Sequence, residues 1–102
     1  MTDLDISPEH LGLVRAILAR HLSTEVKVWV FGSRATGGAK RFSDLDLALQ
    51  GAQALPQGVL RDLAESFDDS DLPWKVDVLD WAETGAAFRQ IIERDRVPFP
   101  IP

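Results

Sequence analysis

The sequence predicts an α+β fold, a small sheet backed by helices, and three observations support this. The 102 residues are enough for one compact domain and too few for two. An apolar fraction of 45% and a charged fraction of 26% are ordinary for a globular chain that buries a core. Segments of helical and of strand spacing follow one another in the order helix, strand, turn, strand, helix, strand, helix.

The composition excludes several classes of function. The chain has no cysteine, so disulfides, thiolate metal sites and cysteine nucleophiles are ruled out. No uninterrupted apolar run exceeds four residues, and the acidic start lacks the features of a signal peptide, so we expect a cytoplasmic protein without a membrane span. Sixteen acidic against eleven basic residues give a net charge of −5, which argues against direct binding of nucleic acid.

The first element is a helix that begins at Pro8. Ser7 is the expected N-cap, Pro8 suits the first helical position, and Glu9 places an anion near the positive end of the helix dipole. Apolar residues at helical spacing predict one buried face: Leu11, Val14, Ile17, Leu18 and Leu22. No carboxylates at ligand spacing accompany His10 and His21 on this helix, so we assign these histidines no function.

Three later segments have the composition of strands. Residues 26–31 are β-branched and aromatic, and the segment stops at a glycine. Residues 44–49 alternate strictly between leucine and a smaller or charged residue, and residues 74–79 form the third strand. A glycine-bounded turn, residues 32–38, lies between the first two strands. So short a link favours neighbouring positions in the sheet.

Two further helices are expected in the second half of the chain. The first opens at Pro56 and buries four apolar residues: Leu60, Leu63, Ala64 and Phe67. The second runs from Asp80 or Thr84 to Arg94 and is expected to bury three residues: Phe88, Ile91 and Ile92. Both helices would cover the sheet with one apolar face.

The chain closes with a proline at every second position. Alternate prolines remove backbone donors and favour extended neighbours, so residues 97–102 cannot be helical. We therefore expect a domain over residues 1–96, followed by an extended Pro-rich tail over residues 97–102. Such a tail could dock on a partner.

Aspartates in the middle of strands are the candidate functional residues. Asp44 and Asp46 alternate with leucines that require one buried face, so both carboxylates lie on the other face. Asp77 repeats this pattern in the third strand, between Val76 and Val78. Like charges beside a core are costly unless a cation or hydrogen-bond donors compensate them. If the third strand pairs with the second, three carboxylates meet in a pocket suited to Mg²⁺.

The turn before the second strand weighs against a plainer interpretation of these aspartates. In that interpretation they face solvent, with Lys75 as a salt-bridge partner. However, Gly32 and Ser33 follow directly on the first strand, where backbone amides and a hydroxyl can closely approach an anion. The combination of features is far more specific than any one of them. A glycine turn is followed, after ten further residues, by an aspartate pair on a strand and then by an isolated mid-strand aspartate.

At this combination the sequence resembles the polymerase-β-type nucleotidyltransferase superfamily. The resemblance rests on residues 31–37 (FGSRATG), residues 44–47 (DLDL) and residues 76–78 (VDV). The small size and the GSRA form are most similar to the minimal nucleotidyltransferases, which include MntA-type antitoxins paired with HEPN toxins. The matching part covers about residues 28–79 and implies a small mixed sheet in a polymerase-β-like core.

The resemblance implies a role for each matching carboxylate. Asp44 and Asp46 would be ligands of two Mg²⁺ ions. Asp77 would be the third carboxylate, which assists metal binding or activates the acceptor. Lys75 stands two residues before Asp77, where it would either contact phosphate or occupy space meant for metal.

The resemblance also implies that the turn binds the nucleotide. Gly32 and Ser33 would hold the β- and γ-phosphates of ATP. Arg34 matches a basic position that such turns often carry, and it would neutralise the triphosphate. The alternative for Arg34 is a solvated loop arginine.

These residues lead to two main hypotheses of function. In the first, the chain is a Mg²⁺-dependent nucleotidyltransferase, a protein adenylyltransferase that moves AMP from ATP to a hydroxyl of a helical HEPN-type partner. Because the chain has no tyrosine, any modified tyrosine must belong to the partner. In the second, a non-catalytic antitoxin or binding module neutralises the partner by contact. Transfer to a small molecule of the aminoglycoside type is a third alternative. The sequence leaves open whether the chain forms a homo-oligomer.

Overall fold

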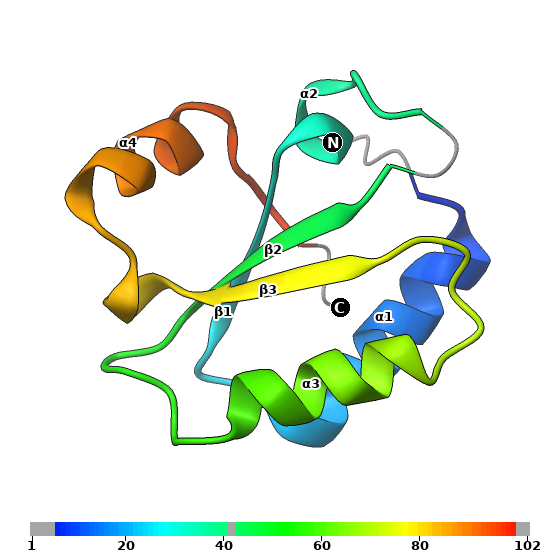
Figure 1. Ribbon diagram of the computed structural model, residues 1–102, viewed down its shortest axis with the longest axis horizontal. Coiled ribbons are helices and arrows are strands. Elements are labelled where there is room, and N and C mark those ends of the chain that lie inside the picture. The colour runs from blue at the N-terminus through cyan, green and yellow to red at the C-terminus, as the bar shows by residue number, and fades with distance from the viewer. Residues whose placement is uncertain (1–5, 41–42, 100–102) are drawn as a thin grey trace.

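The computed structural model describes residues 6–40 and 43–99, which contain a four-stranded sheet of order β3-β2-β1-β4 (Figure 1). The strands are β1 (Lys27–Phe31), β2 (Leu45–Gln50), β3 (Val76–Asp80) and β4 (Val97–Pro98). β1 is antiparallel to β2 and to β4, whereas β2 and β3 are parallel. The small mixed sheet is therefore confirmed, and the second predicted strand pairs with the third, which the sequence alone had left open.

The helices lie before, between and after these strands. They are α1 (Pro8–His21), α2 (Ser33–Thr36), α3 (Val59–Asp68), the 3₁₀ turn η1 (Trp81–Glu83) and α4 (Ala86–Asp95). α1 and α3 lie side by side, and Nε2 of His21 is 2.9 Å from Oγ of Ser66 across them (Figure 1). None of the helices in the described ranges has the length and hydropathy needed to cross a bilayer.

The start of α1 agrees with the sequence, and the start of α3 does not. Ser7 caps α1 as predicted, and its Oγ accepts a hydrogen bond from the backbone N–H of His10 at 3.3 Å. α3 begins at Val59 rather than Pro56, because Gly58 adopts a left-handed conformation with φ +88° that no helix continues through. Pro56 instead opens a turn, in which its carbonyl accepts from the N–H of Val59.

The core lies between α1, α3 and one face of the sheet. Alternate strand residues enter it, as the strict alternation predicted: Val28, Val30, Leu45, Leu47 and Leu49. α1 and α3 meet them with Val14, Ile17, Leu18, Leu63 and Phe67. The other face carries Trp29, Phe31 and Asp46. Ala48 also points to that face and is 0% exposed, so the second face is covered at this end.

α4 lies over one end of that second face (Figure 1), and its packing differs from the expectation. Of the three apolar residues expected to be buried, only Ile92 is, at 1% exposure. Phe88 is 44% exposed and Ile91 is 51% exposed. The helix begins at Ala86 because Asp80 still belongs to β3, and its carboxylate accepts the backbone N–H of Ala82 to cap η1 instead.

Two arginines, rather than an apolar stripe, hold α4 against the rest of the fold. They are Arg89 in the helix and Arg96, which directly follows it. Nε and Nη2 of Arg89 donate to the carbonyl of Trp81 at 3.0 and 2.6 Å. The guanidinium of Arg96 lies 4.0 Å from the ring centroid of Trp29 and 5.0 Å from that of Trp81. Such cation–π contacts contribute about 0.5–2 kcal/mol each, so the helix stays in place with two of its apolar residues exposed.

The residues after α4 join the sheet instead of leaving the domain. Val97 pairs with Val30 across β4 and β1, and Phe99, which is buried, donates its N–H to the carbonyl of Val28 at 2.9 Å. Pro98 is tolerated because β4 is an edge strand. The expected extended shape is found here, but the expected separation from the fold does not hold for residues 97–99. Residues 100–102 lie outside the described part.

Candidate active site

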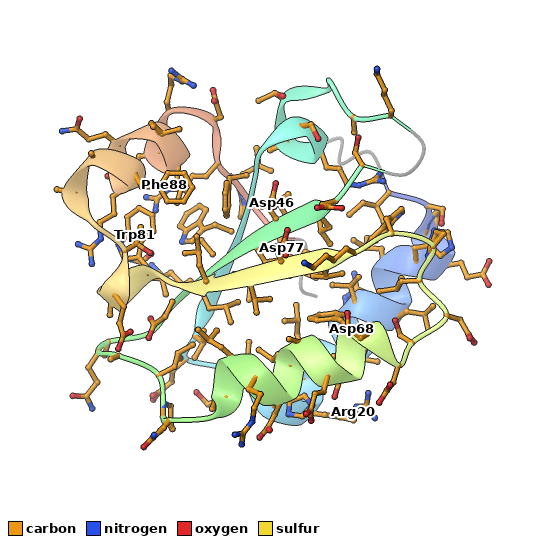
Figure 2. All side chains as sticks on the ribbon, in the orientation of Figure 1. Arg20, Asp46, Asp68, Asp77, Trp81 and Phe88 are labelled. Atoms are coloured by element: carbon orange, nitrogen blue, oxygen red, sulfur yellow. The ribbon has the colours of Figure 1, made fainter. Side chains whose placement is uncertain are left out.

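A row of three side chains crosses the second face of the sheet. Phe31 of β1 pairs with Asp46 of β2, and Asp46 pairs with Asp77 of β3. Directly paired residues point to the same face, about 5 Å apart on neighbouring strands. Figure 2 shows Asp46 and Asp77 side by side on the two strands. The fold thus brings together Asp46 and Asp77, each of which the sequence placed on the face of its own strand that points away from the core.

Asp44 and Lys75 lie beside this pair. Asp44 stands one residue before β2 and is exposed. Nζ of Lys75 is 3.5 Å from Oδ1 of Asp77, across a largely exposed surface where such pairs contribute about 0–1 kcal/mol. The ion pair expected in the plainer interpretation is therefore present, although it is weak. Within the described ranges, no three acidic or histidine side chains are grouped so that they alone could hold a metal ion.

The carboxyl of Asp46 carries an electrostatic penalty. Partial burial, which is the largest cause, together with the negative charges of Asp77 and Asp44, raises the pKa of Asp46 from 3.8 to about 6. The ionised form of this side chain is therefore costly in the folded protein. A cation bound beside Asp46 would reduce this penalty.

In metal-free buffer, we expect ionisation of Asp46 to lower the free energy of unfolding as the pH rises. Because the pKa is raised from 3.8 to about 6 on folding, the folded state binds more protons in that window, and this stabilisation is lost above it. The full shift corresponds to about 3 kcal/mol, which solvent screening of a half-exposed group reduces to roughly 1–2 kcal/mol. Urea unfolding with EDTA at about pH 4 and about pH 7 measures the loss.

The Asp46→Asn variant supplies the reference for this measurement. Its stability relative to wild type should rise by roughly 1–2 kcal/mol between the two pH values. Asp71→Asn, at an exposed position, should show no such rise. A constant difference between wild type and Asp46→Asn across the range would show that Asp46 is not the group responsible.

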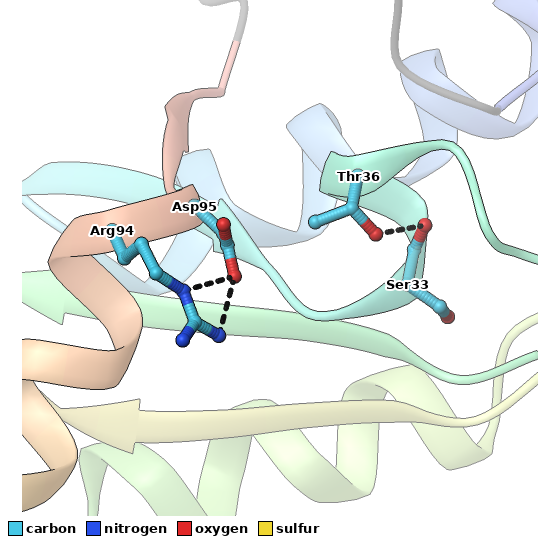
Figure 3. Close-up of polar contacts among 4 residues, drawn as sticks. All are labelled: Ser33, Thr36, Arg94 and Asp95. Carbon is cyan, nitrogen blue, oxygen red and sulfur yellow. Dashed lines mark hydrogen bonds and ion pairs between the residues drawn. The ribbon is translucent and has the colours of Figure 1, made fainter.

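The glycine turn lies against the carboxylate of Asp46. Gly32 has φ +76°, and a Cβ at this position would overlap Oδ2 of Asp46. The N–H groups of Ala35 and Thr36 donate to the carbonyl of Gly32 at 3.0 and 3.2 Å, which closes α2. The hydroxyl of Thr36 donates to the carbonyl of Ser33 at 3.4 Å (Figure 3). Glycine therefore lets the backbone approach this carboxylate closely, and Ser33 begins α2 beside it.

The burial of Arg34 and its hydrogen-bond partner were not predicted from the sequence. Its side chain is 4% exposed, so the alternative of a solvated loop arginine is wrong. Nε and Nη2 donate to the carbonyl of Ser43 at 3.0 and 2.8 Å, and the guanidinium lies 4.6 Å from the ring centroid of Trp74. Arg34 thus ties the turn to the residue just before Asp44. No sequence signal indicates a backbone carbonyl as its partner, and its role toward a triphosphate stays a prediction.

Replacing Arg34 by lysine should destabilise the protein by about 1.5–3 kcal/mol. Lysine keeps the charge but offers neither paired donors nor a planar group to stack on an indole. Arg94→Lys is the matched control, because Arg94 is exposed and pairs with its sequence neighbour Asp95 (Figure 3). It should change the free energy of unfolding by less than about 0.5 kcal/mol. Equal effects in urea unfolding would contradict the buried role of Arg34.

Comparison with known families decides what kind of domain holds this site. The family model described as "Polymerase beta, Nucleotidyltransferase" matches residues 14–98. The chain belongs to this nucleotidyltransferase family. The match includes the glycine turn and all three carboxylates of the site. It confirms the predicted fold class and the prediction of a nucleotidyltransferase.

This nucleotidyltransferase is similar to proteins of toxin–antitoxin systems. It is 48% identical over 91 residues to the "Probable protein adenylyltransferase MntA" of Haemophilus influenzae, which covers 89% of this chain and 79% of the relative. A solved "toxin-antitoxin with AMP-PNP" matches with a TM-score of 0.73 at 22% identity, over 90% of this chain and 73% of the other.

A second solved relative of this nucleotidyltransferase contains a modified partner. It is a "tri-AMPylated Shewanella oneidensis HEPN toxin in complex with MNT antitoxin", and it matches with a TM-score of 0.57 at 20% identity. The match covers 90% of this chain and 73% of the other. Because both solved relatives are below 25% identity, these two likenesses show the fold alone.

Proposed function

We propose that this nucleotidyltransferase transfers AMP from ATP to a hydroxyl of a HEPN-type protein partner. The observation that carries the proposal is the row in which Asp46 and Asp77 stand side by side, with the backbone of Gly32 against Asp46. The 48% identity to a protein named as a probable protein adenylyltransferase supports the reaction. The AMPylated HEPN toxin in a solved relative's complex supports the partner.

The carboxylates fit divalent cations. Mg²⁺ in nucleotide sites is held by one or two carboxylates, with phosphate oxygens and water completing its shell. Asp46 lies close enough to Asp77 and Asp44 for their charges to raise its pKa, so a cation could be shared among these side chains. Asp44 and Asp46 would hold two Mg²⁺ ions, with Asp77 as the third carboxylate. When bound, these ions would neutralise the triphosphate and lower the pKa of the attacking hydroxyl.

The residues of the chain would position the reacting groups. Gly32 and Ser33 would hold the β- and γ-phosphates through backbone and hydroxyl. Asp77 would orient the acceptor hydroxyl and accept its proton. The acceptor oxygen then forms a bond to the α-phosphorus, the bond between that phosphorus and the bridging oxygen breaks, and pyrophosphate leaves. Phosphoryl transfer of this kind depends on positioning and charge neutralisation, which these groups would supply.

The chain itself limits the acceptor. It contains no tyrosine, so a modified tyrosine must belong to the partner, and self-modification would use serine or threonine. Asp77 lies on the outer strand β3, where a group from a second protein can approach it. We therefore place the acceptor hydroxyl on the partner.

Incubation with ATP labelled in its α-phosphate tests this proposal. The purified chain with Mg²⁺ and its HEPN-type partner should label the partner and neutralise it, and EDTA should abolish both effects. Asp44→Asn should lose transfer, whereas Asp71→Asn, another exposed aspartate, should retain it. Neutralisation by Asp44→Asn without label would instead establish a contact-only antitoxin. Label on an aminoglycoside and not on protein would establish the small-molecule alternative.

A further inference from the structure

One aromatic ring is exposed next to the candidate active site. Among the phenylalanine and tryptophan side chains in the described ranges, only that of Phe88 is exposed, at 44%. It packs edge-on against Phe31, with ring centroids 5.9 Å apart and an interplanar angle of 85°. Figure 2 shows Phe88 on α4, on the side of the sheet that carries Asp46 and Asp77. The ring is therefore held in place while much of its surface stays open.

Phe88 extends the row of side chains that crosses the sheet. Phe31 pairs with Asp46, Asp46 pairs with Asp77, and Phe31 directly precedes Gly32. The row thus runs from an exposed aromatic ring, through a second ring, to two carboxylates beside the glycine turn. A ligand anchored at that turn by its phosphates needs to span only one intervening side chain to reach Phe88.

We propose that Phe88 is a stacking surface for the nucleobase of the nucleoside triphosphate, with Phe31 fixing the orientation of its ring. The inference rests on the proposed function and adds the base subsite that the phosphate and metal positions leave open. Stacking on an aromatic side chain is available to every base, because each has a π-face. Phe88 therefore contributes affinity for the nucleotide without selecting adenine over guanine.

The size of the exposed apolar surface favours a base over a protein. Phe88 and Ile91 are the large apolar side chains exposed in the described ranges, and they lie one helical turn apart on α4. Two half-exposed side chains supply only a small part of the roughly 800 Å² that each partner buries in a stable protein interface. A single planar base needs no more than one such ring.

Binding measurements with matched ligands test the base subsite. Calorimetry with Mg²⁺ would compare a non-hydrolysable ATP analogue with tripolyphosphate, which has the phosphates but no base. We expect Phe88→Ala to weaken the analogue about tenfold and to leave tripolyphosphate unchanged. Phe88→Trp should keep the affinity for the analogue, and Phe88→Leu, which is apolar without a π-face, should lose most of it. Ile91→Ala, at a similarly exposed position, should bind both ligands as wild type does.

The outcomes separate this proposal from the function on which it rests. If wild type binds neither ligand, the nucleotide site fails and the proposed function fails with it. If wild type binds the analogue and Phe88→Ala binds it equally well, the base subsite is wrong and the function stands. Equal losses for analogue and tripolyphosphate would show a structural role for Phe88. Unchanged nucleotide affinity with lost binding of the HEPN-type protein would make Phe88 a protein contact.

Discussion

Replacing Asp46 by asparagine is expected to slow AMP transfer by about 10²–10³-fold, the cost of removing one preorganised charge from a transfer site. Asparagine has nearly the same shape, so the row from Phe31 to Asp77 should persist. The carboxylate that faces both the glycine turn and the neighbouring strand is lost. Single-turnover transfer of label from ATP to the partner measures the effect, with Asp71→Asn as the control.

The stability of the Asp46→Asn variant distinguishes lost chemistry from lost structure. Because burial and two like charges penalise the ionised carboxyl, the variant should melt at or above the temperature of wild type in EDTA above about pH 7. A variant that is inactive and also melts lower would indicate a damaged fold. A transfer rate within about threefold of wild type would remove Asp46 from the catalytic site, since single charged groups in such sites contribute far more.

Replacing Gly32 by alanine is expected to impair both stability and transfer. A non-glycine residue at φ +76° costs about 1–2 kcal/mol, and the added Cβ would overlap Oδ2 of Asp46. The turn or the carboxylate must then shift. A displacement of about 1 Å can cost about 10²-fold in rate. Urea unfolding measures the first effect, and transfer to the partner measures the second.

Gly37→Ala is the matched control for this experiment. Gly37 has φ +87°, and a Cβ there would meet no atom within 4 Å. Its alanine variant should therefore show the backbone cost without the displacement of Asp46. If both variants lost transfer equally, strain in the turn, and not contact with the carboxylate, would explain the loss.

The parts of the fold that depend on neighbouring residues could be predicted from the sequence. Alternation with leucine placed Asp46 on the face opposite the core, and Ser7 followed by Pro8 marked the start of α1. Both are local rules of period or capping. The pairing of Asp46 with Asp77 was conditional on strand order, which one sequence does not determine.

Features that depend on distant contacts could not be predicted. The spacing of Phe88 and Ile92 is the same whether a helix face packs or stays open, and only the second residue is buried. Arg34 sits in a glycine turn, but its partner is the carbonyl of Ser43, whose position is fixed by the folded loop. The prolines near the end of the chain indicated an extended shape, and only folding showed that β1 is its partner.

β3 is an edge strand, so Asp77 lies at the edge of the sheet. No further strand among the described residues lies beyond β3, so the sheet does not enclose the candidate active site on that side. A folded partner protein can therefore present its acceptor hydroxyl from the edge of the sheet, without inserting it into a closed cavity. Water could otherwise attack the nucleotide in place of the acceptor hydroxyl. We expect the site to be closed against water only when the partner protein binds.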